Sequence, residues 1–271
     1  MLDYIEDEAL DCILVDASGV LYTKTSVVDN ATEVFLQAYG RSKKIFVVTN
    51  NSTLSVSDIL KKLRNFGFSI ELDQIISSGM GLTLDPHLKK LVSGKKCYCV
   101  GWDSSLHYMA TSGASIVEQL EEADVVVCLS SFFEGNDKVF GDLGAYLRNN
   151  PQIPIICTNP DKYIRTNDSL YQVVGYHVEK MASEFGLQIQ WFGKPYENFS
   201  KMVGKILGDK GITIGKNVRF FDDNYENVAS MVDHLGIQGT CVVQTGLSRD
   251  IDFSKEGDLH PSVNFIDRFT L

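Results

Sequence analysis

Carboxylate side chains directly follow two short apolar runs of this sequence. Asp16 comes after the run 12–15, and the adjacent Asp222 and Asp223 come after the run 218–221. Brought together, three carboxylates would offer the hard oxygen ligands that Mg²⁺ prefers in proteins. Each could instead be an ordinary cap of a turn or a helix. The pattern therefore predicts a magnesium site if the fold brings the ends of both runs together.

Hydroxyl and amide side chains follow a third apolar run, 45–48, in the order Thr49, Asn50, Asn51. As structural groups they would simply begin the next helix. As a site, the same hydroxyl and amides could hold an oxyanion. Gly19, just beyond the first carboxylate, would let the backbone approach such an anion closely.

One lysine stands at the start of a helical segment. Lys194 lies between Gly193 and Pro195, and residues 196–207 have helical periodicity. Proline suits the first turn of a helix. A lysine at that point could act on an anion together with the helix dipole. Alone, the triplet is more typical of a plain turn, so its meaning depends on which residues the fold places beside it.

Two kinds of segment, expected strands and expected helices, alternate along the chain around these polar residues. Short apolar runs typical of buried strands alternate with segments of helical periodicity, such as Ile59, Leu63 and Phe66 before Gly67. This alternation predicts an α/β fold with a parallel sheet, in which binding groups gather at the carboxyl ends of strands. The remaining apolar runs are 75–76, 97–100, 125–129, 153–157 and 241–243, and the remaining helical segments are 31–39, 138–148, 170–185 and 225–235.

The polar motifs are unevenly spaced. Thr49 and Lys194 stand 145 positions apart, and the gap holds several more strands and helices than one crossover requires. An inserted domain explains such a gap. We therefore expect a Rossmann-like core formed by 1–80 and 186–271, with a smaller α/β cap domain inserted at 81–185.

Net charge and hydropathy limit the kinds of partner. With 25 basic and 35 acidic residues, the formal charge is −10. Because nucleic acids and anionic membranes are bound by clustered basic residues, we expect neither as a partner. No apolar stretch approaches the roughly 18–20 residues that span a bilayer. The acidic start of the chain also lacks the layout of a signal peptide, so we expect a cytoplasmic protein.

The order of these motifs resembles that of the haloacid dehalogenase superfamily, in which an Asp motif, a Thr or Ser, a Lys and an acidic pair follow one another. Within it, the sequence is similar to the NagD-type branch, whose cap is inserted between the second and third motifs. The resemblance covers roughly residues 10–247. It is carried by D-A-S-G-V-L-Y at 16–22, T-N-N-S at 49–52, T-N-P-D at 158–161 and G-K-P at 193–195.

The resemblance implies a phosphatase acting on a small phosphorylated metabolite. Asp16 would attack phosphorus and form an aspartyl-phosphate, while Thr49 and Lys194 hold the transferring oxygens. The cap would cover the leaving group and set specificity, and a homodimer through the cap is a further expectation. Substrate contacts would come from Gly19, Asn50, Asn51, Asn159 and Asp161.

The resemblance also implies Mg²⁺ as cofactor. The ion would be held by Asp16, the backbone carbonyl of Ser18 and Asp222. Either Asp223 or Asn227 would reach it directly or through water. A cation at this point would offset the repulsion between a carboxylate nucleophile and an anionic substrate.

Two positions depart from the usual pattern. Ser18 stands where the superfamily usually has the Asp that acts as general acid and base, and Asn227 replaces a distal acid. D-A-S-G-V-L-Y is nevertheless similar to the first motif of the phospholysine phosphohistidine inorganic pyrophosphate phosphatases. The departure leaves two alternatives open: a hydrolase of this superfamily that is not a phosphatase, and a catalytically weak protein that binds a phosphorylated ligand.

Overall fold

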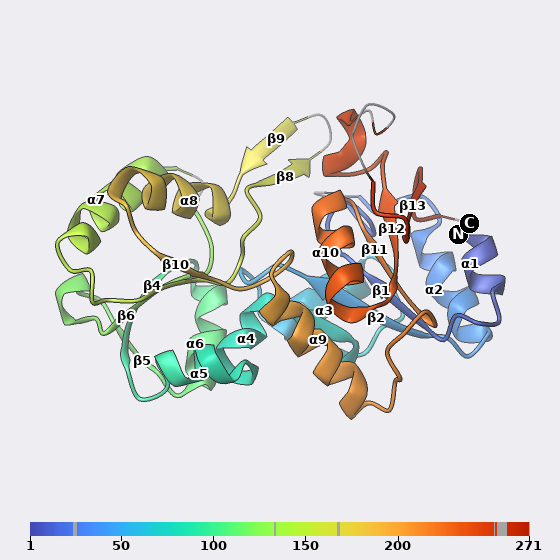
Figure 1. Cartoon of the computed structure of the whole chain (residues 1–271), viewed down its shortest axis with the longest axis horizontal. Coiled ribbons are helices and arrows are strands. Elements are labelled where there is room, and N and C mark those ends of the chain that lie inside the picture. The colour runs from blue at the N-terminus through green and yellow to red at the C-terminus, as the bar shows by residue number, and fades with distance from the viewer. Residues whose placement is uncertain (24–25, 133, 167–168, 252, 254–258, 271) are drawn as a thin grey trace.

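A six-stranded parallel sheet forms one half of the molecule in the computed structural model, which describes residues 1–23, 26–132, 134–166, 169–251, 253 and 259–270. The strand order is β13-β12-β11-β1-β2-β3, so the first strand lies near the middle (Figure 1). The strands are β1 (Cys12–Val15), β2 (Lys44–Thr49), β3 (Ile75–Ser77), β11 (Val218–Asp222), β12 (Gln238–Val242) and β13 (Val263–Ile266).

Continuous apolar runs form the central strands because both faces of this sheet are covered. Along β1, Ile13 and Val15 pack with the helices of one face, and Cys12 and Leu14 pack with those of the other. The first face carries α1 (Leu2–Glu6), α2 (Ala31–Gly40) and α3 (Val56–Asn65), and the second carries α9 (Glu197–Asp209) and α10 (Tyr225–Leu235).

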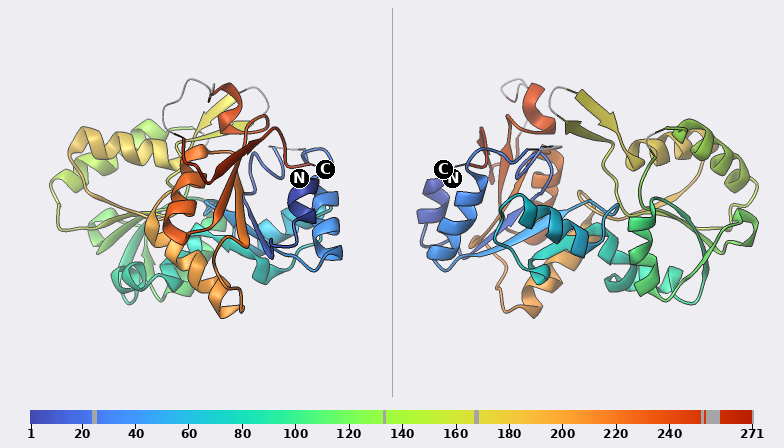
Figure 2. Two further views of the ribbon diagram at one scale, coloured as in Figure 1. Left: turned by 45° about the vertical axis from the view of Figure 1, so that its right-hand side comes forward. Right: turned by 180° about the vertical axis from the view of Figure 1, so that it is seen from behind.

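A second parallel sheet, of five strands in the order β10-β7-β6-β4-β5, forms the other half (Figure 1). Its strands are β4 (Lys96–Val100), β5 (Ser115–Val117), β6 (Val125–Cys128), β7 (Ile155–Cys157) and β10 (Ile189–Trp191). The helices of this half are α4 (Gly81–Leu84), α5 (Pro86–Val92), α6 (His107–Ser112), α7 (Asn136–Arg148) and α8 (Val174–Phe185). An antiparallel pair, β8 (Tyr163–Thr166) and β9 (Ser169–Gln172), extends from this half toward the C-terminal elements of the first (Figure 2).

The α/β prediction is confirmed, and the predicted strands coincide with observed ones. The expected helix 170–185 is wrong at its start, because residues 169–172 pair with β8 and the helix begins only at Val174. Three further strands, β5, β10 and β13, are only three or four residues long and carry no long apolar run. The five-stranded sheet reaches Trp191, beyond the expected cap boundary at 185, and the domain limits stay a prediction.

The chain passes between the two halves at a narrow neck. Gly81 begins α4 on the way in, and Phe192 follows β10 on the way out. The two residues are in direct contact, since a Cβ on Gly81 would lie 2.2 Å from Cε1 of Phe192. Apolar residues of both sheets also share one hydrophobic cluster, which includes Leu14 and Val127. No helix within the described ranges is long and apolar enough to cross a membrane.

Candidate active site

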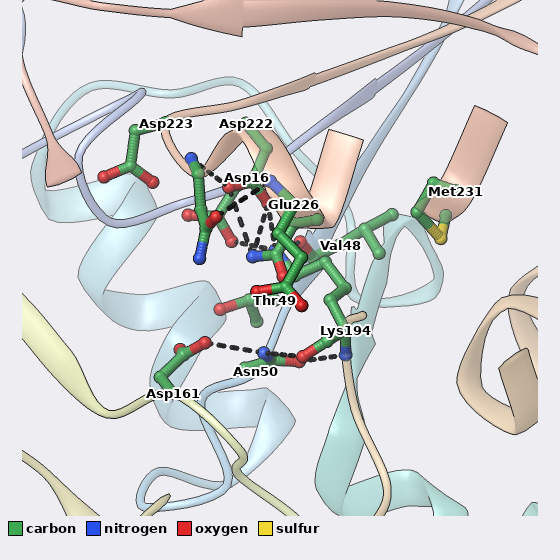
Figure 3. Close-up of polar contacts among 12 residues, drawn as sticks. Asp16, Val48, Thr49, Asn50, Asp161, Lys194, Asp222, Asp223, Glu226 and Met231 are labelled. Atoms are coloured by element: carbon green, nitrogen blue, oxygen red, sulfur yellow. Dashed lines mark hydrogen bonds and ion pairs between the residues drawn. The ribbon is translucent and has the colours of Figure 1, made fainter. Parts of the chain in front are cut away.

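Three carboxylates gather at the carboxyl edge of the six-stranded sheet. Because β1 and β11 are parallel neighbours with Val15 opposite Phe221, the residues that follow them emerge together. One ligand atom each from Asp16, Asp222 and Asp223 lies within 4.8 Å of the others, and all three residues are buried (Figure 3). The fold thus brings together the three carboxylates whose positions in the sequence suggested a cation site.

Lys194 neutralises part of this negative charge. Its Nζ donates to Oδ1 of Asp16 at 2.5 Å, to Oδ2 of Asp222 at 2.6 Å and to the carbonyl of Val48 at 3.1 Å. Burial alone would lower the pKa of this lysine, but the two carboxylates raise it above its ordinary value. Lys194 is therefore a fixed cation within the described site.

One ammonium does not balance three carboxylates. Burial and the charge of Asp222 raise the pKa of Asp16 to about 7, even though Lys194 opposes the shift. Burial, Asp222 and Asp16 raise the pKa of Asp223 well above its ordinary value. These shifts mark an excess of negative charge in a poorly solvated place, which a bound cation would relieve.

Glycines leave room for the third carboxylate. A Cβ on Gly19 would lie 2.3 Å from Oδ2 of Asp223, and one on Gly246 would lie 1.8 Å from the same atom. The backbone N–H of Leu247 donates to that oxygen at 2.7 Å. Gly19, expected to approach substrate, therefore packs closely against Asp223 while it also lines the cavity.

The predicted Thr-Asn-Asn segment follows β2, at the same edge of the sheet. Thr49 and Asn51 line the cavity, and the Asn51 side chain also accepts hydrogen bonds from the N–H groups of Thr53 and Leu54. Asn50 differs, because it is fully buried and is not among the cavity-lining residues. Its amide instead donates to Oδ1 of Asp161 at 2.8 Å, so it connects the two halves of the molecule (Figure 3).

Asp161 lies in the loop between β7 and β8. It is half-buried and lines the cavity. Burial raises the pKa of its carboxyl group to about 6, while Lys194 and the Asn50 amide partly oppose the shift. Its neighbour Asn159 also lines the cavity, with its Oδ1 accepting from the N–H of Asp161.

A cavity of about 750 Å³ contains these groups. The predicted residues that it brings together are Asp16, Ser18, Gly19, Thr49, Asn51, Asn159, Asp161, Lys194, Asp222 and Asp223. Both halves of the molecule supply its wall. Residues that the sequence did not single out include Tyr22, Lys62, Trp102, Phe132 and His177. Tyr22 ends the motif at 16–22 but had no role assigned to it, and the other four stand singly in the sequence, where no motif marks them.

Asn227 lies beside the carboxylates. Its Nδ2 is 3.3 Å from Oδ1 of Asp222, and among the described residues its buried Oδ1 has no hydrogen-bond partner. A buried acceptor without a donor is costly unless water or a ligand reaches it. The donor set is thus three carboxylates with an amide oxygen beside them, a combination suited to a hard divalent cation.

Comparisons with known proteins agree with this geometry. Residues 13–115 match the family model described as haloacid dehalogenase-like hydrolase. The acid sugar phosphatase of Staphylococcus aureus (strain USA300) is 26% identical over 256 residues, which cover 94% of this chain and 93% of that protein.

Solved structures share the fold. A possible sugar phosphatase of the haloacid dehalogenase superfamily from Cytophaga hutchinsonii superposes with a TM-score of 0.84 at 22% identity, covering 97% of this chain and 95% of that one. The glycerol phosphate phosphatase Rv1692 of Mycobacterium tuberculosis, in complex with magnesium, gives a TM-score of 0.77 at 18% identity over 96% of this chain and 76% of that one. NagD of Escherichia coli K-12 has the same fold.

Proposed function

We propose that this chain is a haloacid dehalogenase-like hydrolase of the NagD-like branch and that it hydrolyses phosphate esters or anhydrides of small metabolites. The observation that supports this most is the contact of Asp16 with Lys194 at the floor of a cavity lined by both halves of the molecule. Phosphoryl transfer asks a protein mainly for position and for stabilisation of charge. This cavity offers an aligned carboxylate and a fixed cation.

Asp16 is the proposed nucleophile. A carboxylate oxygen of Asp16 attacks phosphorus, the bond to the leaving oxygen breaks, and an aspartyl-phosphate forms. Water then attacks phosphorus, which releases inorganic phosphate and regenerates the carboxylate. Lys194 favours the ionised form of Asp16 and orients it, and Thr49 offers a hydroxyl to the transferring oxygens.

Mg²⁺ is the proposed cofactor. Asp16, the carbonyl of Ser18 and Asp222 would hold it, with Asp223 or Asn227 as a further direct or water-mediated ligand. The excess of buried carboxylates and the unpartnered oxygen of Asn227 support this assignment. When bound, the ion would neutralise charge between the nucleophile and an anionic substrate.

The half built on the five-stranded sheet is the proposed cap. It contributes Trp102, Phe132 and Asp161 to the cavity wall, whereas the nucleophile comes from the six-stranded sheet. In this arrangement the phosphoryl group lies against the first sheet, and the leaving group lies against the second half. Substrate choice would then depend mainly on the side chains of the cap, together with those of the first half that line the same part of the cavity.

A panel of phosphorylated metabolites, including sugar phosphates and pyrophosphate, tests the proposal. Release of inorganic phosphate is measured with Mg²⁺, with excess chelator, and after Mg²⁺ is restored. We expect release from at least one compound, loss with chelator and recovery with the ion. Release that is indifferent to chelator would remove the metal from the proposal, and a panel without any release would contradict the phosphatase activity itself.

A further inference from the structure

A lysine of α3 lies in the wall of the cavity without an acidic partner. Lys62 is half-buried and lines the same cavity as Asp16. Its Nζ lies 4.0 Å from the centre of the Tyr22 ring and 5.9 Å from that of Phe66. Within the described part of the chain, no carboxylate forms an ion pair with it. Contact with aromatic rings stabilises a cation, but it does not supply the counter-charge of an anion.

The neighbouring basic residues of α3 differ from Lys62. Lys61 is exposed and pairs with Asp58 at 3.0 Å, and Arg64 pairs with Glu71 at 2.7 Å. Both pairs lie on the solvent side of the helix, away from the cavity lining. Burial lowers the pKa of Lys62, and no carboxylate of the described residues pairs with it to oppose the shift. Its position thus differs from that of an ordinary surface lysine.

Tyr22 relates this lysine to the nucleophile. The Tyr22 ring is buried, and it carries Nζ of Lys62 over its face. Asp16, Tyr22 and Lys62 all line the same cavity. Among the described residues, the ammonium in contact with Asp16 is that of Lys194. Lys62 is thus placed to meet a part of a bound substrate other than the phosphoryl group.

We propose that Lys62 binds a second anionic group of the substrate, a carboxylate or a phosphate, at the end opposite the transferred phosphoryl group. The preferred substrates would then carry two anionic groups. This inference rests on the proposed phosphatase activity and extends it to the chemical class of the substrate. It gives the half-buried ammonium the counter-charge that the described residues do not provide.

Three aryl phosphates allow the effect of a second anionic group to be measured apart from that of the transferred phosphoryl group. Phenyl phosphate carries no second anion, 3-carboxyphenyl phosphate carries a carboxylate, and 3-phosphonophenyl phosphate carries a doubly ionised group. All three have a phenolate leaving group. The measured quantity is a ratio: kcat/KM for each of the two compounds with a second anionic group, divided by kcat/KM for phenyl phosphate. Comparison of the carboxylate ratio with the phosphonate ratio shows which anion Lys62 prefers.

Lys62→Met keeps the length of the side chain and removes its charge. We expect the ratio to fall about 10-fold or more for at least one of the two compounds, mostly through KM, because Met cannot form the charge-assisted hydrogen bond that the ammonium forms with an anion. Lys62→Arg should retain most of the ratio. Lys61→Met, the adjacent lysine that faces solvent, is the matched control and should leave the ratio at the wild-type value.

A ratio that is the same in wild type and Lys62→Met would overturn the proposal, as would an equal fall in Lys61→Met. Circular dichroism and the melting temperature of each variant identify a folding defect, and Lys62→Arg then decides the question. Failure of the wild-type protein to hydrolyse any of the three aryl phosphates would instead count against the phosphatase activity. The two failures are therefore distinguishable.

Discussion

Asn50 binds both backbone polar groups of Lys194. The N–H of Lys194 donates to Oδ1 of Asn50 at 2.7 Å, and Nδ2 of Asn50 donates to the carbonyl of Lys194 at 2.9 Å. One side chain from the loop after β2 thereby fixes the backbone of a residue 144 positions away in the chain. The position of the fixed cation depends on this contact as much as on the carboxylates that its Nζ meets.

Asn50→Ala should therefore lower both stability and activity. The change leaves a buried donor and a buried acceptor of Lys194 without partners, which costs about 1–3 kcal/mol. Because a displacement of about 1 Å can slow a reaction about 10²-fold, phosphate release should fall by about that factor. Urea unfolding and steady-state kinetics measure the two effects. Asn149→Ala, an exposed asparagine, serves as control and should change stability by less than about 0.5 kcal/mol. Equal behaviour of the two variants would contradict the role of Asn50.

Asp16→Asn should abolish phosphate release while the protein stays folded. The amide is nearly the same size as the carboxyl group but is a far poorer nucleophile, and loss of a covalent nucleophile costs about 10⁴-fold or more in rate. Lys194 keeps its contact with Asp222, so its charge is not left alone. Phosphate release and urea unfolding of the same preparation measure both properties. Wild-type turnover in this variant would show that Asp16 is not the nucleophile.

Because residue 18 is a serine, the rate of hydrolysis should depend strongly on the pKa of the leaving group. The Ser18 hydroxyl cannot donate a proton near neutral pH as a tuned carboxyl group can, a contribution of about 10²–10⁴-fold. Alkyl phosphates should therefore be hydrolysed slowly, and aryl phosphates, acyl phosphates or pyrophosphate much faster. Ser18→Asp should selectively accelerate the alkyl phosphates. The measurement is a series of esters of increasing leaving-group pKa, and a flat series for both proteins would indicate that another group supplies the proton.

The stability of the protein should depend on pH through Asp161. Its pKa is raised to about 6, from an ordinary value of 3.8, so the folded state binds this proton more tightly than the unfolded state. The contribution of Asp161 to stability is therefore largest below about pH 4 and is lost as the pH rises through 6. Asp161→Asn, which keeps an acceptor for Asn50, should gain stability relative to wild type over the same range.

Unfolding by urea between pH 4.5 and 7.5 measures this difference. Asp137 provides a control of opposite sign, because its hydrogen bond with Lys180 lowers its pKa. Asp137→Asn should lose stability relative to wild type by an amount that stays nearly constant over this range, because the contribution of a carboxyl group with a lowered pKa is lost only below its ordinary value of 3.8. A difference between Asp161→Asn and wild type that does not vary with pH would contradict the shift assigned to Asp161.

Strand ends were predictable from the sequence because a buried parallel strand is an apolar run and its end is the first polar residue. Asp16, Thr49 and Asp222 were located by this rule, and their convergence follows from the parallel order of β1, β2 and β11. The contact of Lys194 with Asp16 forms only because the chain leaves the first half near Gly81, builds the second half and returns to the first half near Phe192. Only the resemblance to a family suggested it.

Other features carry no signal in one sequence. Lys62 looks like any lysine on the polar face of an amphipathic helix, and only tertiary structure shows that this part of the face lines a cavity. Residues 170–172 were predicted as the start of a helix, but in the structure they belong to β9, which pairs only with the short strand β8 among the described residues. Short strands whose stability depends on a single neighbour leave little trace in composition.

The neck between Gly81 and Phe192 has a consequence for how the molecule melts. The two sheets have separate hydrogen-bond networks, but they share apolar contacts at and around this neck, and Tyr108 of the second half donates to the carbonyl of Leu54 in the first. Loss of either sheet would expose the apolar surface of the other, so their unfolding is expected to be cooperative. Differential scanning calorimetry should then show one heat-absorption peak for the whole chain. Gly81→Ala, which forces a methyl group against the Phe192 ring, should move that single peak to lower temperature or divide it in two.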